Sequence, residues 1–170
     1  MTLAFKEWSY IVDALGTGRQ SIILRKGGIS EDSDEFKLKG KRFALLPTLF
    51  HQGKDHIKEQ WLPFLKPERY HKSPEEVRID YFAEVADTRI ITDYAQVKKL
   101  SAYHAWKDEI IDERFNRWNQ SVHLIVVQVF ELVKPVELFM KPEYGGCKSW
   151  VELDEDIELI GKPVLNKTII

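Results

Sequence analysis

Apolar and polar residues alternate along residues 77–85. The apolar side of the alternation consists of Val77, Ile79, Tyr81, Ala83 and Val85. A period of two places these side chains on one face of an extended chain, so the pattern predicts a β-strand. The preceding residues, 73–76, read Ser-Pro-Glu-Glu, which is typical of a helix start with a capping box. We therefore expect at most one helical turn before the strand begins.

Four further segments have the composition of strands. Residues 122–133 are rich in Val and Ile and predict a central strand with both faces covered, with residues 135–138 as its bent continuation. Shorter strands are expected at residues 20–26, 43–50 and 150–153. Pro47 has no amide hydrogen to donate, so it should lie at a sheet edge or a bend.

Apolar spacings of three and four, which are typical of helices, occur in several segments. Residues 5–15 place Phe, Trp, Val and Leu side chains on one helical face, and Gly-Thr-Gly at 16–18 would end this helix. Residues 55–62 predict a short helix, and residues 93–100 predict another that starts with an Asp-x-x-Gln cap. A longer helix should follow over residues 106–118.

This order of elements predicts a single α+β domain over residues 1–170, with a mostly antiparallel sheet and peripheral helices. A length of 170 residues fits one domain, and 44% apolar with 31% charged residues is close to the average of soluble globular proteins. The N-terminus does not resemble a secretory signal, and no apolar run approaches the ~18 residues of a membrane helix. We therefore expect a cytoplasmic protein that has no contact with a membrane.

The charge of the chain is nearly balanced, with 25 Lys+Arg against 27 Asp+Glu and a formal net charge of -2. Proteins that bind nucleic acid strongly and without sequence preference usually carry a basic excess. Binding of RNA or DNA would therefore require a local basic patch. The acidic residues 31–35 and the lysines that follow predict a solvated hairpin connection.

Several short motifs follow one another along the chain. They are Lys6-Glu7-Trp8, Gly18-x-Gln20, Leu24-Arg25-Lys26-Gly27-Gly28-Ile29, Pro47-Thr48 followed by His51-Gln52, Tyr103-His104-x-Trp106, and Pro142-Glu143-Tyr144-Gly145-Gly146-Cys147-x-Ser149-Trp150. In this combination the chain resembles an uncharacterised prokaryotic family, domain-of-unknown-function family 1802, over nearly its whole length. The resemblance implies no established activity, and it favours these turns as the functional surface.

A second resemblance concerns the fold alone. A strand, a helical excursion and a long strand with a Pro-Val bend are similar to the small β-barrels of the PUA and ASCH type, which bind RNA or modified bases. The resemblance implies that the sheet could form a small barrel of the PUA-like type. A shared fold does not by itself establish a function.

Two of the motifs carry polar side chains suited to ligand binding. Arg25 and Lys26 precede two glycines, so this turn could present amide N–H groups and positive charge to an anion; the alternative is a glycine turn that closes a strand. His51 and Gln52 follow a strand and could supply an acid–base group and read a base edge. Their alternative role is to tie the loop by hydrogen bonds.

A third motif combines aromatic rings with a histidine. Tyr103, His104 and Trp106 could stack on a flat ligand, and base–aromatic stacking contributes about 1–3 kcal/mol per base. In the alternative interpretation, Trp106 belongs to the core and Tyr103 covers it.

Metal-dependent chemistry has little support in the sequence. The five histidines lack metal-ligand spacing and only one cysteine is present, so we expect no metal site and no cofactor. A nuclease would need carboxylates and a lysine that converge, yet Glu35 and Lys37 lie in a charged loop, and Glu84 and Asp87 lack a suitable lysine. The single thiol, Cys147, is expected to be structural.

The leading hypothesis is a non-enzymatic binding module for a nucleic-acid base or nucleotide, with RNA, DNA or a nucleotide as partner. Its cleft would be lined by Arg25, Lys26, His51, Gln52, Tyr103, His104 and Trp106. One rival is a small enzyme that acts on a nucleotide-like substrate, with His51 or His104 as general base and Glu84 as its partner. Another is a subunit that docks a protein through an exposed apolar patch including Trp150 or Phe139. The sequence leaves open whether the chain is an enzyme.

Overall fold

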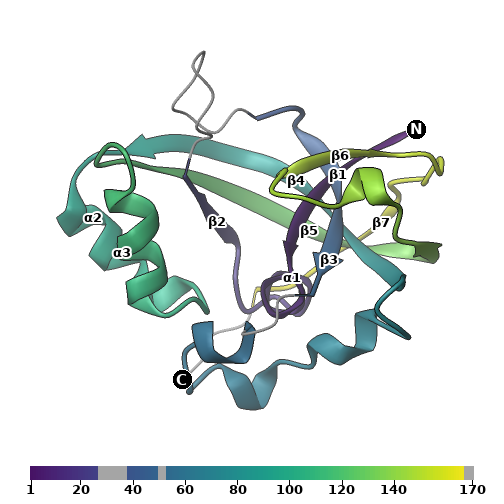
Figure 1. Cartoon of the computed structure of the whole chain (residues 1–170), viewed down its shortest axis with the longest axis horizontal. Coiled ribbons are helices and arrows are strands. Elements are labelled where there is room, and N and C mark those ends of the chain that lie inside the picture. Colours follow the sequence, from purple (N-terminus) through teal and green to yellow (C-terminus); the bar gives the residue numbers. More distant parts are fainter. Residues whose placement is uncertain (27–37, 50–52, 167–170) are drawn as a thin grey trace.

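The computed structural model describes residues 1–26, 38–49 and 53–166, which form a mixed α+β fold (Figure 1). The strands are β1 (Thr2–Trp8), β2 (Ile22–Arg25), β3 (Arg42–Thr48), β4 (Glu76–Ile91), β5 (Val122–Phe139), β6 (Trp150–Leu153) and β7 (Gly161–Pro163). The α-helices are α1 (Ser9–Gly16), α2 (Tyr94–Lys99) and α3 (Asp108–Asn116). Single 3₁₀ turns are η1 (Gly53–His56), η2 (Leu62–Phe64), η3 (Pro67–Tyr70), η4 (Leu100–Tyr103) and η5 (Pro142–Tyr144). The predicted acidic connection at 31–35 lies outside the described residues.

The strands form one sheet in the order β2-β5-β4-β3-β1-β6, and β7 pairs with β5. Among the described strands, only β1 and β3 pair in parallel, so the predicted α+β class with a mostly antiparallel sheet is confirmed. The sheet differs from the small barrel that the sequence allowed, because within the described chain no pairing joins β2 to β6 and closes it. Among the described helices, none has the length and apolar character needed to cross a membrane.

The N-terminal segment corrects the helix predicted over residues 5–15. Residues 2–8 form β1, which pairs with β3 on one side and with β6 on the other, and α1 begins only at Ser9. β1 is buried on both faces, and such a strand does not show the alternation of a half-exposed one. Pairing with two neighbours therefore decided the structure, although the spacing of Phe5 and Trp8 matched a helix.

The two longest strand predictions are confirmed by β4 and β5, which run side by side along the molecule (Figure 1). The amide of Glu76 donates to Ser73 Oγ at 3.2 Å, so a cap-like bond forms even though β4 follows. Pro47 lies where β3 pairs with β1 but no longer with β4, in agreement with the expected edge position.

The predicted helices are confirmed unevenly. Asp93 caps α2 through a 3.0 Å bond from the amide of Ala95, as expected. α3 is shorter than the predicted helix over 106–118, because Trp106 forms an isolated β-bridge with Ile57 before α3 begins. That bridge also interrupts residues 55–62, where the structure has η1 and turns in place of a helix.

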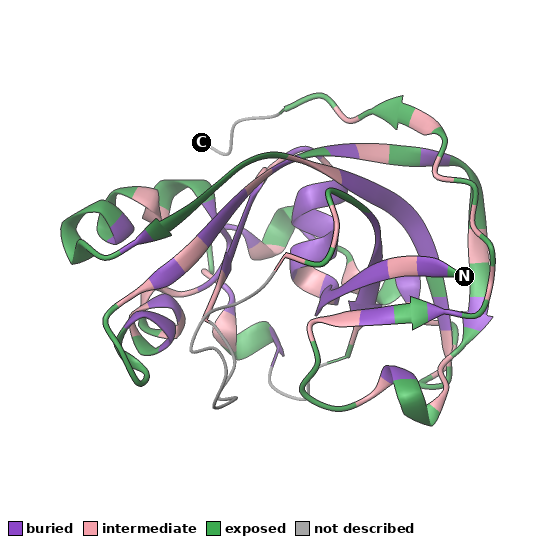
Figure 2. Cartoon of the chain, turned by 90° about the horizontal axis from the view of Figure 1, so that it is seen from above, coloured by how far each residue is buried: buried purple, intermediate pink, exposed green. Residues whose placement is uncertain are grey.

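Buried apolar residues form two clusters on opposite faces of the sheet. Figure 2 shows that long stretches of the strands consist of buried residues. Phe5 and Phe43 belong to the larger cluster, whereas their neighbours Ala4 and Ala44 belong to the smaller one, as alternate residues of a strand should. α1 lies in the larger cluster, and a Cβ added at Gly16 would come within 2.1 Å of the Tyr81 ring. This close packing fixes α1, and with it the position of Ser9 at its start.

Candidate functional site

Three cavities lie around His71, which lines all of them. The Arg78 cavity, of about 420 Å³, is lined by Arg69, Lys72, Arg78 and Glu137 among others. The Lys6 cavity, of about 290 Å³, is lined by Lys6, Thr48, Tyr144 and Gly146. The Trp8 cavity, of about 300 Å³, is lined by Trp8, Ser9, Tyr10, Thr48 and Glu68. Thr48 and Leu49 line both the Lys6 and the Trp8 cavities, so these two adjoin, and we call the three cavities together the His71 hollow.

Segments far apart in the sequence bring these side chains together. The parallel pairing of β1 with β3 places Trp8 opposite Thr48, so both strands end at the hollow. η5 reaches the same place because Lys6 Nζ donates to the carbonyl of Gly146 at 2.9 Å. The motifs Lys6-Glu7-Trp8, Pro47-Thr48 and Tyr144-Gly145-Gly146, on which the family resemblance partly rests, therefore meet at one site.

Lys6 is 8% exposed, and the carbonyl of Gly146 is its one hydrogen-bond acceptor within the described chain. An ammonium group has three donors, so two of them have no protein partner among these residues. Burial, together with the nearby cations Lys148 and Arg25, lowers the pKa of Lys6. The described residues include no carboxylate that forms an ion pair with Lys6. A buried cation in this state favours an anion or an acceptor group in the cavity beside it.

Ser9 and His71 form the polar contact at the centre of the hollow. Ser9 Oγ lies 2.5 Å from His71 Nε2 and 2.9 Å from the carbonyl oxygen of Thr48. Burial lowers the pKa of His71, which keeps the imidazole neutral near pH 7. Ser9 is 4% exposed and stands where β1 passes directly into α1. This contact therefore joins β1, β3 and the segment after η3.

A buried carboxylate holds the segment that carries His71. Asp13 of α1 is fully buried and accepts hydrogen bonds from the Tyr70 hydroxyl at 2.5 Å and from the amide of Lys66 at 2.8 Å. Its Oδ1 atom also lies 3.2 Å from Arg69 Nε. Burial and the Asp13 charge raise the pKa of Tyr70, so its hydroxyl stays protonated and donates. Asp13 therefore positions His71 indirectly, because it holds Tyr70, the residue that precedes His71.

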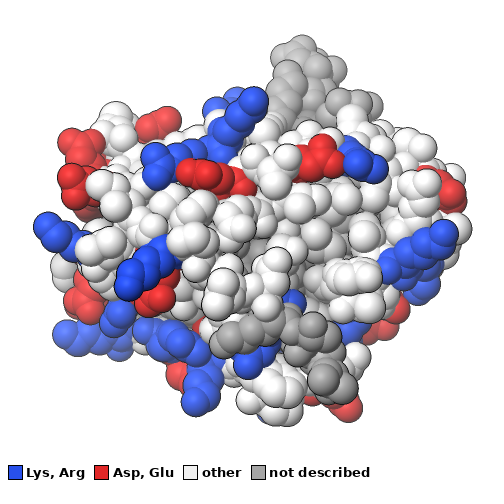
Figure 3. Space-filling model, turned by 180° about the vertical axis from the view of Figure 1, so that it is seen from behind, with Lys and Arg blue, Asp and Glu red and all other residues white. Residues whose placement is uncertain are grey.

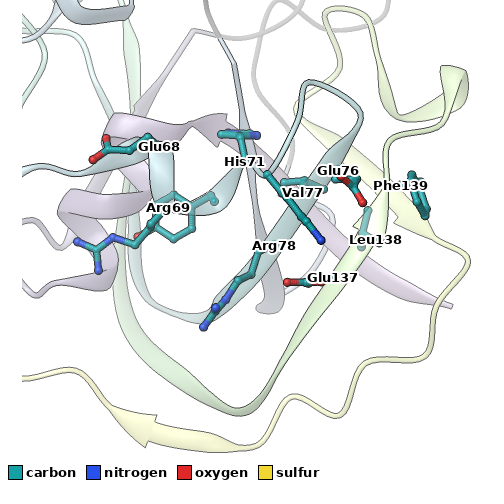
Figure 4. Close-up of a pocket in the computed structure, with 11 residues that line it drawn as sticks. Glu68, Arg69, His71, Glu76, Val77, Arg78, Glu137, Leu138 and Phe139 are labelled. Carbon is teal, nitrogen blue, oxygen red and sulfur yellow. The ribbon is translucent and has the colours of Figure 1, made fainter.

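The Arg78 cavity has a mixed charge. Arg78 stands opposite Glu137 in the pairing of β4 with β5 (Figure 4). Its Nε atom lies 2.6 Å from Asp80 Oδ1. Arg69 lies beside Glu68 in Figure 4, at the opposite end of the labelled group from Phe139. Its Nε atom contacts Asp13. Because Arg69 and Arg78 already have carboxylate partners, this cavity offers less positive charge to a ligand than its residue types suggest.

The candidates Arg25 and Lys26 have partners inside the protein. Arg25 Nη2 donates to the carbonyl of Lys6 at 2.6 Å, and the same atom lies 3.3 Å from Glu7 Oε2. Lys26 Nζ donates to the carbonyls of Phe115 and Ser121 at 3.2 and 2.8 Å. Arg25 therefore supports the Lys6 segment from behind, and Lys26 holds the end of α3. A contact of either side chain with a ligand remains a prediction.

The aromatic candidates lie at the end of the molecule that carries α2 and α3. Trp106 is fully buried and His104 is 1% exposed, whereas Tyr103 is 64% exposed. Burial and the neighbouring Lys58 lower the pKa of His104 to about 3. This geometry fits the alternative interpretation, in which Trp106 is part of the core. His51 and Gln52 lie outside the described residues, so a cleft that contains all seven candidates stays a prediction.

The residues on which the rival hypotheses depend have different contacts in the structure. Glu84, the suggested partner of a histidine base, forms an ion pair with Arg42 at 3.2 Å, and no contact joins it to His104 in the described chain. Trp150 packs against Phe5 and Phe43, each at 4.9 Å between ring centroids, while Phe139 is 65% exposed. Cys147 is an exposed free thiol.

The surface charge is as mixed as the composition predicts. On the face in Figure 3, positive and negative side chains lie interspersed around a broad uncharged area. Among the described residues, no three or more His, Cys, Asp or Glu side chains come together in a group that could hold a metal ion. The positive charge in the Lys6 cavity is that of Lys6, which forms no ion pair with a carboxylate of the described residues.

Sequence reasoning missed Lys6, Ser9 and His71 as site residues. Lys6 belonged to a quoted motif, but the helix predicted for its segment hid its place in the sheet. Ser9 and His71 have no motif of their own, and the 62 positions between them give no spacing signal. The position of Ser9 just after a strand that leads into a helix was the one available hint, and it required β1 to be recognised.

Comparisons with known proteins place the chain in a family and leave its function open. No curated protein matches it. Among solved structures, the chain is similar to a mutant of the ASCH protein from Zymomonas mobilis, with 7% identity, a TM-score of 0.46, and coverage of 82% of this chain and 88% of that one. A family model described as a domain of unknown function, DUF1802, matches residues 4–169. The chain belongs to this family, as its ordered motifs suggested.

Proposed function

We propose that the His71 hollow binds a nucleotide or a nucleic-acid base that carries a phosphate. The observation that supports this most is the adjacency of the Lys6 and Trp8 cavities, which share Thr48, Leu49 and His71. One cavity offers a buried cation and the other offers aromatic rings. A nucleotide has the matching parts, an anionic phosphate and a flat base, close together.

The Lys6 cavity would take the phosphate. Lys6 Nζ has two donors without a protein partner in the described chain, and the glycines of the η5 turn leave room beside it. A phosphate oxygen there would supply both the missing acceptor and the missing negative charge. Hydrogen bonds to charged groups contribute about 1.5–3 kcal/mol, so this contact should dominate the affinity.

The Trp8 cavity would take the base. Trp8 and Tyr10 are half-buried and line this cavity together with Pro67. The Arg114 guanidinium lies 5.4 Å from the Trp8 ring centroid and holds the ring from the protein side. Stacking on an aromatic ring tolerates any base because every base has a π-face. The carbonyl of Thr48 and the carboxylate of Glu68 provide acceptors for a base edge.

The test is a binding titration of the full chain with a nucleoside 5′-monophosphate, the matching nucleoside, inorganic phosphate and a short single-stranded RNA and DNA. The monophosphate should bind at least about tenfold more tightly than the nucleoside, since its phosphate adds a charged contact. Single strands should bind more weakly as salt rises, with a small slope because few phosphates are contacted.

Lys6→Met removes the ammonium group and keeps an unbranched chain of similar length. It should weaken the monophosphate about tenfold or more and leave the nucleoside nearly unchanged. Lys134→Met is the matched control, because Lys134 is exposed on β5 and lines none of the three cavities. Equal affinity of wild type and Lys6→Met for the monophosphate would contradict the proposal.

A further inference from the structure

We propose that Ser9 and His71 form a nucleophile–base pair that hydrolyses carboxylic esters carrying a negatively charged group. The inference rests on the proposed function in one respect, because Lys6 would hold the negative charge of the substrate. It adds a reaction to the site, with Ser9 as the residue that becomes acylated. It also differs from the enzyme considered from the sequence, since neither His51 nor His104 takes part.

The geometry of the pair fits general-base catalysis. Ser9 Oγ lies 2.5 Å from His71 Nε2, within the range at which a histidine can take the proton of a hydroxyl. Both residues line the Trp8 cavity, so an ester group in that cavity lies next to Oγ. A serine–histidine contact that served packing alone would not need a cavity on its open side.

The hydroxyl proton of Ser9 has two acceptors in reach. One is His71 Nε2, and the other is the carbonyl oxygen of Thr48 at 2.9 Å. For attack, the proton must point to Nε2 while the carbonyl of Thr48 limits the rotation of the side chain. A neutral imidazole can accept this proton, and burial, which lowers the pKa of His71, keeps the ring neutral.

The start of α1 can stabilise the negative charge that develops during attack. α1 has eight residues, begins at Ser9, and has no side-chain hydrogen bond capping its N-terminus. The first amide N–H groups of a helix have no partner within the helix and carry its positive dipole end. An oxyanion formed on a carbonyl next to Ser9 Oγ would lie at this end of the helix.

The reaction proceeds in two balanced steps. Ser9 Oγ forms a bond to the ester carbonyl carbon while His71 Nε2 takes the hydroxyl proton, and the bond from that carbon to the alcohol oxygen then breaks as Nε2 returns the proton to the leaving alcohol. In the second step a water oxygen attacks the acyl carbon of acyl-Ser9 and its proton passes to Nε2. The bond to Oγ then breaks and Oγ recovers the proton. Nothing is oxidised, and water is the only co-reactant.

The shape of the hollow limits the substrate. Lys6 lines the cavity that adjoins the one containing Ser9, so an anionic group on the substrate would lie beside the ester. An ester that carries a carboxylate or a phosphate should therefore react better than a neutral ester of the same leaving group. This preference distinguishes the pair from a merely reactive serine.

The first experiment needs no variant. The full chain is incubated with a fluorophosphonate probe, which phosphonylates activated serines, and the modified peptide is identified by mass spectrometry. The expected result is a single adduct on Ser9, formed at least about 10²-fold faster than on any other serine, in line with the contribution of a positioned base. Absence of a Ser9 adduct in folded protein would overturn the proposal.

The second experiment compares the hydrolysis of 4-nitrophenyl acetate and 4-nitrophenyl succinate, a neutral and an anionic ester. Ser9→Ala and His71→Gln should each lower kcat by about 10²- to 10⁴-fold for both esters. Ser73→Ala is the matched control, because the Ser73 hydroxyl bonds to Glu76 and not to a histidine, and its kinetics should equal those of wild type. Lys6→Met should raise KM for the succinate ester only.

The outcomes separate this inference from the proposed function. If Ser9→Ala hydrolyses both esters as wild type does while Lys6→Met still loses the monophosphate, the hollow binds an anion and the reaction is refuted. If Ser9→Ala loses hydrolysis but Lys6→Met changes neither ester nor monophosphate, the pair is active and the anion site is refuted. Both proteins are compared after their thermal unfolding shows that they are folded.

Discussion

Two regions of the molecule each hold a lysine and a histidine away from solvent, and they differ in how these residues are partnered. At the end that carries α2 and α3, Lys58 Nζ donates to the carbonyls of Ser101 and His104 and lies 3.7 Å from Asp108 Oδ1. In the His71 hollow, Lys6 has one acceptor within the described chain and a cavity beside it. The first lysine is saturated by the protein, and the second leaves donors for a ligand.

A buried arginine lies between the two regions. Arg114 donates to the carbonyl of Leu24 at 2.9 Å, and its guanidinium lies 5.4 Å from the Trp8 ring and 5.0 Å from the Trp106 ring. Burial lowers its pKa to about 10, so it stays charged at neutral pH. The same side chain thus supports an aromatic wall of the hollow and the aromatic core at the other end. The two regions therefore differ in the number of polar partners of their lysines and in the cavity beside Lys6.

The largest difference between the two regions should appear in the free energy of unfolding when each lysine is replaced by methionine in a separate variant. Lys58→Met leaves the carbonyls of Ser101 and His104 without their donor, while Asp108 keeps its ion pair with Lys98. Breaking such a partly buried network should lower the free energy of unfolding by about 3 kcal/mol. Lys6→Met removes a buried cation that has one acceptor and should change it by less than about 1 kcal/mol. Urea unfolding of both variants measures this, and similar losses would contradict the comparison.

The buried His104 predicts a loss of stability in acid. His104 has its pKa lowered to about 3 from 6.5, so between these values the unfolded chain binds a proton that the folded chain does not. Stability should therefore fall as pH drops below 6.5, with a slope approaching about 1.4 kcal/mol per pH unit, or about 2 kcal/mol between pH 6.5 and 5. His104→Gln should remove this part of the slope.

The effect of His104 must be distinguished from that of Asp108, a nearby group that also titrates in acid. A hydrogen bond from Ser101, together with the nearby Lys58 and Lys98, lowers the pKa of Asp108. Its contribution to stability is therefore lost only as pH falls further, below the range of histidine titration. Unfolding by urea at half-unit steps of pH separates the two. A His104→Gln profile parallel to that of wild type from pH 6.5 to 5 would show that His104 is protonated in the folded chain.

A smaller effect is expected from the support of His71. Tyr70→Phe removes a hydrogen bond to the buried Asp13 carboxylate and should cost about 1.5 kcal/mol. The exposed Tyr94, which donates to Asp112 at 2.9 Å, is the matched control, and Tyr94→Phe should cost a few tenths of a kcal/mol. Thermal unfolding compares the two variants. Equal shifts would show that the Asp13 contact has no special weight.

These residues also show what the sequence could and could not predict. β4 was predictable because its apolar face alternates with a polar one, and the α2 cap was predictable from Asp93 and Gln96 alone. β1 was not, since its two faces are both buried and its partners, β3 and β6, are 40 or more residues away. The resemblance identified the motifs but not their contacts, so it did not show that His104 and Trp106 are buried.

The sequence did not predict the His71 hollow for the same reason, because its residues are far apart along the chain. His71 contacts Ser9 across 62 positions, and Asp13 fixes its neighbour Tyr70 across 57. Contacts of this range depend on the whole sheet, and no local spacing encodes them. The number of hydrogen-bond partners that distinguishes Lys6 from Lys58 is likewise a property of the folded chain. In the sequence, each lysine lies between an apolar residue and a glutamate.

The smallest effect is expected at the tyrosine that the sequence favoured, and it distinguishes the two possible binding surfaces. Tyr103 is 64% exposed and lines none of the three cavities, so Tyr103→Ala should change the affinity for a nucleoside monophosphate less than about twofold. Tyr10 lines the Trp8 cavity, and Tyr10→Ala should weaken the same ligand by about fivefold or more if a base stacks there. Titration calorimetry of both variants decides between the two surfaces. A larger loss of affinity in Tyr103→Ala than in Tyr10→Ala would show that the ligand binds at the α2–α3 end.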